Sequence, residues 1–525
     1  MRLRGPLCVV VSLAVSACAT TAPPPSGTPT PTVRRLSGPQ IVPAPASMTL
    51  TGGPAFNVVR ATTIIVSDTT GEVGRIAQAL SAMLHTPIGF PFGVTTTPAD
   101  SVTSTIRLSL SARPDLGDEG YEFTSTPTSV SIVANRPAGL FHGVQTLRQL
   151  LPADIEAEMG RERFDWSVPA LHIVDRPRFA WRGAMLDVAR HFFTVKEVEQ
   201  YIDLLALYKM NTLHLHLSDD QGWRVAINSR PQLALMGGAS QVGGGPGGYY
   251  TQQDYQTIVR YAQDRYITIV PEIDMPSHIN AALVGYPQLG CSARPTGLYP
   301  GTDVGWSSIC TDKEESYAMI DDIVREISAM TPGPYFHIGG DEAHSVPKEK
   351  YIPFVERAQG IVSKYGKTMV GWEEIAQARI SPTAIVQEWK TDSATASLVS
   401  GRRVIMSPAQ KAYIDMKYND STELGLKWAA LIEVRDAYQW DPANFMAGVG
   451  ESNVVGVEAP LWSETIQNIG AAMFLAVPRL PAIAEVAWTP QAARDWENFR
   501  FRLAAQAPRW RYLGINYYPS PQIPW

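Results

Sequence analysis

The sequence has little charge and no excess of basic residues. Charged residues make up 18% of the 525 positions, the formal net charge is -6 and the sequence pI is about 5.9. Nucleic-acid partners usually demand a basic face, so this balance argues against nucleic-acid binding. Beyond the N-terminus there is also no sequence repeat and no apolar run long enough to cross a membrane. The remaining composition is ordinarily globular, at a length that predicts several domains or one large barrel with additions.

Cysteine is scarce, and the four that are present fall into two groups. Cys8 and Cys18 lie in the N-terminal segment, while Cys291 and Cys310 lie in one loop-like stretch. An exported protein meets an oxidising compartment, so we expect a disulfide bond between Cys291 and Cys310 that closes this loop. The alternative is two free buried thiols.

Residues 1–17 have the pattern of an export signal, because a basic start precedes an apolar run too short to remain as a membrane helix. The end of this run, VSAC, resembles a bacterial lipobox, which implies cleavage before Cys18 and acylation of its thiol. The alternative is a plain secretory signal. Residues 18–38 are rich in Pro and Thr and predict an extended linker. We therefore expect an exported protein, lipid-anchored in a bacterial cell envelope, or secreted or periplasmic if the lipobox is not used.

Residues 39–175 predict a small α/β accessory domain. Residues 62–68 and 105–111 alternate between apolar and polar side chains as strands do, and GYEFTS and SVSIVAN form a hairpin-like pair. An amphipathic helix is expected near residues 139–151. His142 on this helix is interpreted as a packing residue without an evident partner.

Residues 176–525 alternate between strand-like and helix-like runs. One predicted helix begins at Thr194 as N-cap, with Glu197 as its capping-box partner. Repeated βα units predict a (β/α)8 TIM barrel, an α/β fold, followed by C-terminal helices near residues 471–488 and 491–503. The eight strand-like runs are RGAMLDVA, NTLHLHLS, YITIVPEID, PYFHIGGDE, TMVGWEE, TAIVQEW, RRVIMSPA and VVGVEAPLW.

The strand ends, where a barrel of this type carries its catalytic residues, are rich in carboxylates and tryptophan. Indole rings cover the apolar faces of a sugar and carboxylates accept hydrogen bonds from its hydroxyls, so this combination favours carbohydrate binding. A single strand-end tryptophan is more often a packing residue, but three of them favour a binding role. Glu373, Glu374 and Glu388 are compatible with solvated or ion-paired carboxylates, and we assign them no role.

His214 and His216 lie two residues apart on one predicted strand, so their side chains point to the same face. A metal-dependent barrel hydrolase of the amidohydrolase type holds zinc with such a pair. His278 and His337 are available as further ligands, but the last strand ends in tryptophan and glutamate rather than an isolated aspartate. We therefore interpret the pair as structural, bonded to neighbouring carboxylates, and expect no metal.

The stretch HIGGDEAH places the carboxyl groups of Asp341 and Glu342 next to each other. Adjacent like charges repel, so an ionised Asp341 is expected to raise the pKa of Glu342 toward neutrality, which suits a general acid. Gly339 and Gly340 let the backbone turn closely beneath a substrate.

These motifs resemble glycoside hydrolase family 20, the β-N-acetylhexosaminidases, over residues 40–525, and most closely its bacterial exo-acting members. EGYEF and GLFHGVQTLRQLL resemble the accessory domain of the family. Ser277 stands where many members have glycine, a departure that we expect to be harmless. The barrel motifs, in the order of the family, are RGAMLDVARHFF, HLHLSDDQGWR, PEIDMPSH, HIGGDEAH, GWEE, SPAQKAYID and APLWSE.

The resemblance implies a retaining exo-β-N-acetylhexosaminidase that removes terminal β-linked N-acetylglucosamine or N-acetylgalactosamine from an oligosaccharide or glycoconjugate. In this family the 2-acetamido oxygen of the substrate is the nucleophile and an oxazolinium intermediate forms. Glu342 is then the general acid and base, and Asp341 orients the acetamide. Asp219 and His278 form a supporting pair that tunes the acid, and Tyr413 donates a hydrogen bond to the acetamide carbonyl.

The same resemblance assigns residues to sugar binding and requires no organic cofactor. Arg190 is expected to bind the outer hydroxyls of the sugar. Asp415 and Glu464 are expected to bind the hydroxyls on the far side of the sugar ring. The Cys291–Cys310 loop and the glycine-rich insertion at residues 236–250 are expected to select among glycans. A glycan-binding lipoprotein without catalytic activity is the other alternative, and it would have lost the acid. The tryptophans expected to wall the acetamide pocket are Trp372, Trp389 and Trp462.

Overall fold

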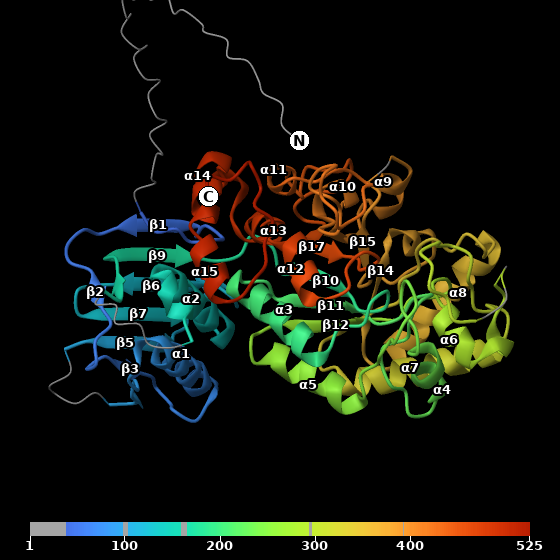
Figure 1. The fold of residues 1–525 in the computed structure, drawn as a ribbon, viewed down its shortest axis with the longest axis horizontal. Helices are drawn as coiled ribbons and strands as arrows, with labels where there is room; N and C mark the ends of the chain where they lie inside the picture. Colours follow the sequence, from blue (N-terminus) through green and yellow to red (C-terminus); the bar gives the residue numbers. More distant parts are fainter. Residues whose placement is uncertain (1–37, 98–102, 159–164, 293, 295–296, 392) are drawn as a thin grey trace, which may run out of the picture. The chain divides into compact units, whose positions relative to one another are not determined.

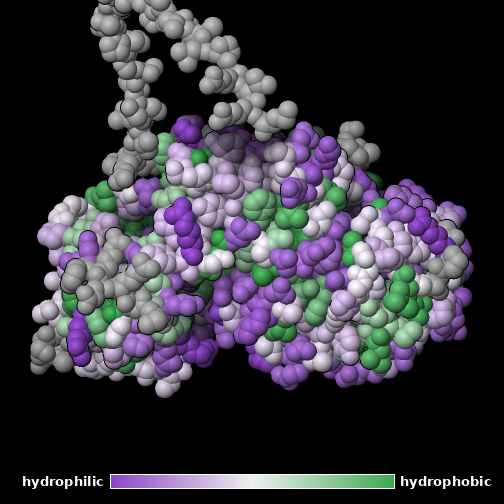
Figure 2. Space-filling model, viewed as in Figure 1, coloured by the Kyte–Doolittle hydropathy of each residue, from purple (hydrophilic) through white to green (hydrophobic). Residues whose placement is uncertain are grey.

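A computed structural model describes residues 38–97, 103–158, 165–292, 294, 297–391 and 393–525 (Figure 1). The predicted signal, Cys18 and nearly all of the predicted linker lie outside the described residues. Apolar and polar residues alternate over the face shown in Figure 2, where hydrophobic patches are small and interrupted.

The N-terminal part folds around a seven-stranded mixed sheet in the order β1-β9-β6-β7-β5-β3-β4. The predicted hairpin is confirmed, because β6 and β7 pair antiparallel with Tyr121 opposite Ala134. Helices α1 (Glu72–Ile88) and α2 (Pro137–Leu150) contact each other and the sheet strands. The strands are β1 Ser47–Leu50, β2 Phe56–Asn57, β3 Thr63–Ile65, β4 Val94–Thr95, β5 Thr105–Leu110, β6 Tyr121–Ser125, β7 Ser129–Ala134, β8 Ser167–Val168 and β9 Leu171–Asp175, with β2 and β8 forming a separate pair.

The second part is a closed barrel of eight parallel strands, which confirms the predicted fold class. β10 pairs with β17 to close the ring, with Trp181 opposite Gly456. The strands follow the eight predicted runs: β10 Trp181–Asp187, β11 Thr212–His216, β12 Thr268–Glu272, β13 Tyr335–His337, β14 Thr368–Trp372, β15 Ile385–Glu388, β16 Arg403–Met406 and β17 Val454–Leu461.

Helices follow most of the strands. The capping box of α3 is present as predicted, because the Thr194 side chain accepts from the Glu197 N–H and the Glu197 carboxylate accepts from the Thr194 N–H. The α-helices are α3 Val195–Leu207, α4 Gln232–Gly237, α5 Gln252–Gln263, α6 Asn280–Gly285, α7 Glu314–Met330, α8 Lys348–Lys364, α9 Ser393–Val399, α10 Ala409–Ala412, α11 Val434–Tyr438, α12 Ile469–Ala476, α13 Arg479–Trp488, α14 Trp496–Ala504 and α15 Ala507–Tyr512. Short 3-10 helices are η1 Pro114–Leu116, η2 Ala153–Glu156, η3 Pro287–Leu289, η4 Glu373–Gln377 and η5 Gln491–Ala493.

The C-terminal helical run expected near residues 471–488 is divided into α12 and α13. Pro478 lies between them, and proline interrupts a helix because it has no N–H to donate and its ring clashes with the preceding turn. Among the described residues no single helix is long and apolar enough to cross a membrane. Only α12 and α13 together, bent by 55°, meet that measure of length and composition.

Buried polar groups join the accessory domain to the amino-terminal ends of the barrel strands. The ammonium group of Lys209 donates to the Tyr121 hydroxyl at 2.8 Å and to Asp175 at 3.2 Å. Arg182 binds Glu119 through both of its terminal nitrogens. The interpretation of His142 as a residue without a partner was wrong, since its Nε2 lies 3.3 Å from the same Glu119 carboxylate. That partner lies 23 residues earlier, beyond the reach of a helical pattern.

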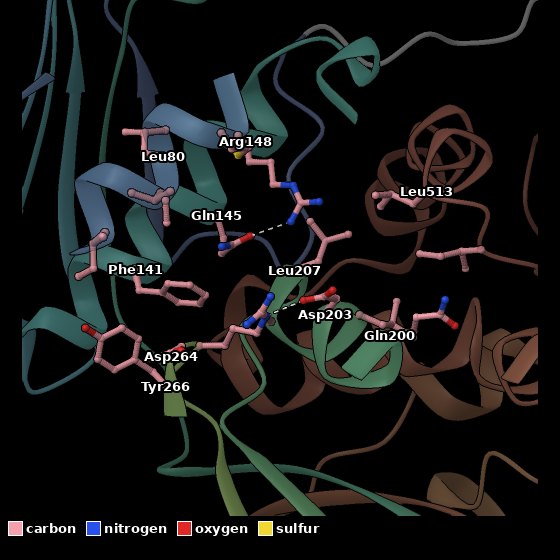
Figure 3. Close-up of a pocket in the computed structure, with 18 of the residues that line it drawn as sticks. Leu80, Phe141, Gln145, Arg148, Gln200, Asp203, Leu207, Asp264, Tyr266 and Leu513 are labelled. Atoms are coloured by element: carbon pink, nitrogen blue, oxygen red, sulfur yellow. Dashed lines mark hydrogen bonds and ion pairs between the residues drawn. The ribbon is translucent and has the colours of Figure 1, made fainter. Parts of the chain in front are cut away.

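A cavity of about 670 Å³ lies where α1 and α2 face α3 and α12 (Figure 3). Apolar and charged side chains both line it, and several of the charged groups have partners, such as Arg148 with Glu156. Figure 3 shows Arg148 directed toward Gln145, at 3.4 Å, and Asp203 accepts from Arg265 at 2.5 Å. The cavity is remote from the carboxyl ends of the strands, where the candidate catalytic residues lie.

Candidate active site

The carboxyl ends of the barrel strands bring the predicted catalytic residues together. The stretch after β13 supplies Asp341 and Glu342, and the stretch after β12 supplies His278 between them and Asp219. His278 Nδ1 lies 3.2 Å from Asp219 Oδ1, while its Nε2 lies 3.5 Å from Glu342 Oε2 and 3.8 Å from Asp341 Oδ2. One imidazole therefore connects the predicted supporting aspartate to both members of the acid pair.

The backbone that presents the pair is tightly turned. Gly339 and Gly340 have φ angles of 67° and 98°, and a Cβ atom on Gly339 would lie 1.8 Å from Asp274 Oδ1. The Gly340 N–H donates to the same Asp274 oxygen at 3.1 Å. Glu342 itself has a φ of 45°, a left-handed backbone conformation that residues other than glycine rarely adopt. The two glycines thus allow the backbone to approach Asp274 closely, and Asp274 anchors the turn.

Asp219 links the pair to Arg190. The Arg190 guanidinium lies 2.8 Å from Asp219 Oδ2, and His216 Nε2 lies at the same distance from that oxygen. Burial opposes ionisation, but the positive charges of Arg190 and His278 hold the pKa of Asp219 well below its usual range. Asp219 is therefore a fixed negative charge behind His278.

The predicted charge order of Asp341 and Glu342 was wrong for the free site. Burial raises the pKa of Asp341 to about 7, and the negative charges of Glu374 and Glu342 add to the rise. For Glu342 burial also acts upward, but the hydrogen bond and charge of His278 outweigh it and lower the pKa. The sequence argument counted only the neighbour along the chain, whereas the through-space partners decide which carboxyl group keeps its proton.

His214 and His216 form a buried layer beneath this cluster, with the contacts predicted for a structural pair. His214 lies 2.8 Å from Glu458 Oε1 and 2.9 Å from Glu272 Oε2. His216 lies 2.5 Å from Glu272 and 2.8 Å from Asp219. Each imidazole is thus held between two carboxylates.

Aromatic rings form one side of the site. Trp372 is 1% exposed, donates to Glu272 Oε1 at 2.9 Å and packs under Trp462, with ring centroids 5.6 Å apart. Tyr413 lies against Trp462 at 6.3 Å and is stacked on Trp389 at 6.5 Å and 18°. The three predicted tryptophans and Tyr413 therefore form one continuous wall.

Asp415 and Glu464 lie close to each other and to Trp462. Burial raises the pKa of Asp415, and the nearby charge of Glu464 adds to the rise. Both carboxylate oxygens of Asp415 and one of Glu464 are buried without a well-formed hydrogen bond to another described residue. Hydroxyl groups of a bound sugar would satisfy these acceptors.

Comparison with known proteins identifies the family of this chain. The family model described as glycosyl hydrolase family 20, catalytic domain, matches residues 179–351 and 344–491, and the model for domain 2 matches residues 38–176. The chain belongs to glycosyl hydrolase family 20.

Relatives of this family 20 chain cover nearly its whole length. A β-N-acetylhexosaminidase of Cellulomonas fimi is 42% identical over 489 residues, which are 92% of this chain and 97% of that protein. The Streptomyces plicatus N-acetyl-β-hexosaminidase in complex with Thio-NAglucal has a TM-score of 0.89 at 49% identity, covering 94% of this chain and 99% of its own. A mutant of that enzyme in complex with its product GlcNAc has the same TM-score and identity and covers 93% and 97%.

Two features of this family 20 site were not predicted from the sequence. Trp428, in the segment between α10 and α11, is 57% exposed, and its ring lies 5.9 Å from those of both Trp389 and Tyr413. The role of Asp274 under the glycine turn follows from contacts between the segment after β12 and the segment after β13. A tryptophan in a segment between two predicted elements was the only sequence signal that could have indicated the first feature.

The two loops expected to select among glycans meet each other. The disulfide between Cys291 and Cys310 is present, as predicted. The Gly243 N–H of the glycine-rich insertion donates to the Pro300 carbonyl inside the disulfide loop at 2.9 Å. Gly305 of that loop lies against His344, two residues after Glu342. The joined loops thus lie beside the acid pair.

Proposed function

We propose that this family 20 chain is a retaining exo-β-N-acetylhexosaminidase that removes terminal β-linked N-acetylglucosamine or N-acetylgalactosamine. The observation that carries the proposal is the adjacent Asp341 and Glu342 at the barrel mouth, bridged by His278 to Asp219. The aromatic wall beside the pair supports it, because indole faces suit a pyranose ring. The relatives named as hexosaminidases support the choice of an N-acetylated sugar.

The geometry divides two tasks between the carboxyl groups. Asp341 is the more buried side chain and lies on the side of the wall, where the acetamide N–H of the substrate can donate to it. Glu342 is more open and is placed to protonate the leaving oxygen. The acetamide oxygen then attacks the anomeric carbon as the glycosidic bond breaks, which gives an oxazolinium ion. Water then attacks the anomeric carbon from the side that the leaving group vacated while Glu342 takes its proton, and the bond to the acetamide oxygen breaks. Because each of the two attacks inverts the anomeric carbon, the configuration is retained overall.

Substrate binding changes which carboxyl group carries the proton. In the free site the pKa of Asp341 is raised to about 7 while that of Glu342 is lowered. An acetamide N–H donates best to an ionised carboxylate, so the bound substrate favours the charged form of Asp341. With that negative charge fixed beside it, Glu342 becomes the better holder of the proton, as the acid step requires.

The acid role is tested with Glu342→Gln. On an aryl N-acetylglucosaminide with a poor leaving group we expect kcat to fall by roughly 10²–10⁴, the range typical for a lost general acid. Asp341→Asn on the same substrate should also lose kcat, because a neutral amide does not hold the developing positive charge. Near-normal turnover by Glu342→Gln would contradict the proposed function.

The glycan specificity is tested with a panel of aryl N-acetylglucosaminides, aryl N-acetylgalactosaminides and chitooligosaccharides, with products resolved. Release of single N-acetylhexosamine units from the non-reducing end is expected. Release of disaccharides would contradict the exo-monosaccharide assignment.

We also propose that residues 1–17 are a signal and that acylation of Cys18 anchors the enzyme in the cell envelope through the linker. The basis is the lipobox-like VSAC and the Pro- and Thr-rich segment that follows. In the native host, Cys18→Ser should move activity from the membrane fraction to the soluble exported fraction. Membrane association that survives this substitution would contradict the lipid anchor.

A further inference from the structure

Three consecutive backbone N–H groups after β15 bind two buried glutamates. The N–H groups of Trp389 and Lys390 both donate to Glu373 Oε2, at 3.0 Å and 2.9 Å. The N–H of Thr391 donates to Glu388 Oε1 at 2.7 Å. Glu373 follows β14 and Glu388 ends β15, so carboxyl groups from two neighbouring strands hold one turn. We call these two side chains the glutamate clamp.

The two carboxyl groups of the clamp are hydrogen-bonded to each other, and both side chains belong to buried residues, 2% and 0% exposed. Two carboxylates offer only acceptors, so a hydrogen bond between them requires one shared proton. Burial raises the pKa of Glu373 to about 9, and the charges of Glu388 and Glu374 add to the rise. The proton is thus retained through neutral pH.

The turn held by the clamp carries the outer part of the aromatic wall. The Trp389 ring is stacked on Tyr413 and contacts Trp428 edge to face. Thr391 has a φ of 60°, a strained value for a β-branched residue, and its hydroxyl accepts from Gln410 at 2.7 Å. A turn in this conformation persists only where its surroundings hold it.

We propose that Glu373 and Glu388 are positioning residues whose shared proton holds Trp389 against Tyr413 and thereby shapes the pocket for the acetamide methyl group. The inference rests on the proposed function, since it assigns that pocket to the N-acetyl group. It gives a role to two glutamates that the sequence left unassigned.

Loss of the shared proton places two buried negative charges under the turn. Other charged or titratable groups lie near the clamp: Glu374 on η4, Lys390 on the turn, Tyr413 after α10, and Asp341 after β13, which interacts with Glu374 and Lys390. Lys390 is the only cation among these four, and its ammonium lies 2.5 Å from Glu374 but 3.9 Å from Glu373. The repulsion between the clamp carboxylates is therefore poorly compensated, and the wall should loosen above about pH 9.

The test compares Glu373→Gln with Glu373→Ala. A glutamine carbonyl still accepts both N–H groups and its amide donates to Glu388, so it imitates the protonated clamp. We expect kcat/KM of Glu373→Gln on an aryl N-acetylglucosaminide to stay within threefold of the original enzyme at pH 7. Glu373→Ala removes the acceptor, and we expect at least a tenfold loss, mainly in KM.

The ratio of the kcat/KM values for two substrates that differ only in the N-acyl group reports on the acetamide pocket and not on the acid–base residues. The kcat/KM for the N-acetyl glycoside divided by that for the N-propionyl glycoside cancels the titration of Asp341, Glu342 and His278. In the original enzyme this ratio should fall at least threefold between pH 7 and pH 9.5. In Glu373→Gln it should stay constant, and in Glu373→Ala it should already be low at pH 7.

The matched control is Glu356→Gln, because Glu356 also accepts a backbone N–H, that of Arg379 at 3.2 Å, on the outer side of η4. It should reproduce the pH dependence of the original enzyme. The proposal is overturned if the substrate ratio of Glu373→Gln falls with pH as it does in the control. It is also overturned if folded Glu373→Ala has the same ratio as the original enzyme at pH 7. Should Glu373→Ala fail to fold, the glutamine variant alone decides. Absence of turnover by the original enzyme would contradict the proposed function rather than the clamp. In that case the affinity for GlcNAc, measured by tryptophan fluorescence at pH 7 and pH 9.5, tests the clamp by comparing the original enzyme with Glu373→Gln and Glu373→Ala.

Discussion

At the scale of residues, charge in this site depends on neighbours in space rather than along the chain. Asp341 and Glu342 are adjacent, yet His278 lowers the pKa of one while burial among carboxylates raises that of the other. The positive charge of His278 is in turn favoured by Asp219, which Arg190 keeps ionised. A chain of alternating charges thus reaches from the barrel wall to the acid pair.

The first prediction concerns the alkaline limb of the pH profile. Below about pH 7 the free site holds one proton on Asp341, and substrate binding passes this proton to Glu342. Above pH 7 both carboxyl groups are ionised and the general acid is missing, so kcat/KM should fall about tenfold per pH unit. In Asp341→Asn the only proton of the pair is the one on Glu342, whose pKa is lowered, so the limb in its residual kcat/KM should move to lower pH. A limb that persists unchanged in this variant would assign the titration to another group.

The second prediction concerns Trp428, which is 57% exposed beside Trp389 and Tyr413. A large apolar ring that is open to solvent contributes little to folding but offers a stacking surface. Trp428→Ala should raise KM for chitooligosaccharides by roughly tenfold, corresponding to about 1.4 kcal/mol of binding, and leave the melting temperature within about 2 °C. Trp525→Ala, another exposed tryptophan, is the control and should leave KM unchanged. Equal KM values in the two variants would exclude Trp428 from the substrate site.

At the scale of elements, short turns after the strands determine the site. The turn after β13 needs two glycines because Asp274 lies directly against it, and the turn after β15 needs the glutamate clamp. The described residues of the disulfide loop and of the glycine-rich insertion form no strand or long helix, and the two segments contact each other and the residues around the acid pair. Rigid strands thus present segments whose conformation depends on a few specific contacts.

The third prediction concerns the disulfide. Cys291 and Cys310 are 19 residues apart, and closing a loop of that length removes unfolded-state entropy corresponding to about 3 kcal/mol. Replacing both with serine should lower the free energy of unfolding by about 2–4 kcal/mol, measured in urea. Because the loop lies beside His344, KM for oligosaccharides should change more than KM for a small aryl glycoside. Reduction of the unmodified enzyme under native conditions should have the same effects, whereas the double variant should not respond to reductant.

At the scale of the whole molecule, the accessory domain and the barrel share a buried polar network. Lys209 and Arg182 of the barrel bind Asp175, Tyr121 and Glu119 of the accessory domain, and all of these contacts lie at the ends of the strands opposite the acid pair. In barrels this end contributes stability, while the other end carries the chemistry. The network should therefore affect unfolding far more than catalysis.

The fourth prediction tests that separation. Lys209→Met leaves the buried Asp175 without its cation and should lower the free energy of unfolding by about 3–5 kcal/mol. KM and kcat at 25 °C should stay within about twofold. Lys350→Met breaks an exposed pair with Asp312, and a change of at most about 1 kcal/mol is expected for that control. Urea denaturation at pH 7 measures both variants, and equal effects would contradict the importance of the buried network.

The sequence by itself determined the eight βα units, the hairpin of the accessory domain, the cap of α3 and the placement of Asp341 and Glu342 at a strand end. These features depend on apolar periodicity, on short-range spacing and on chain order, all of which can be read from neighbouring residues. Only the tertiary structure decided the charges of Asp341 and Glu342, the position of Trp428 and the pairing of Glu373 with Glu388. Those properties arise from groups that meet across different strands, where burial and distances of 3–4 Å govern electrostatic energies that residue order does not contain.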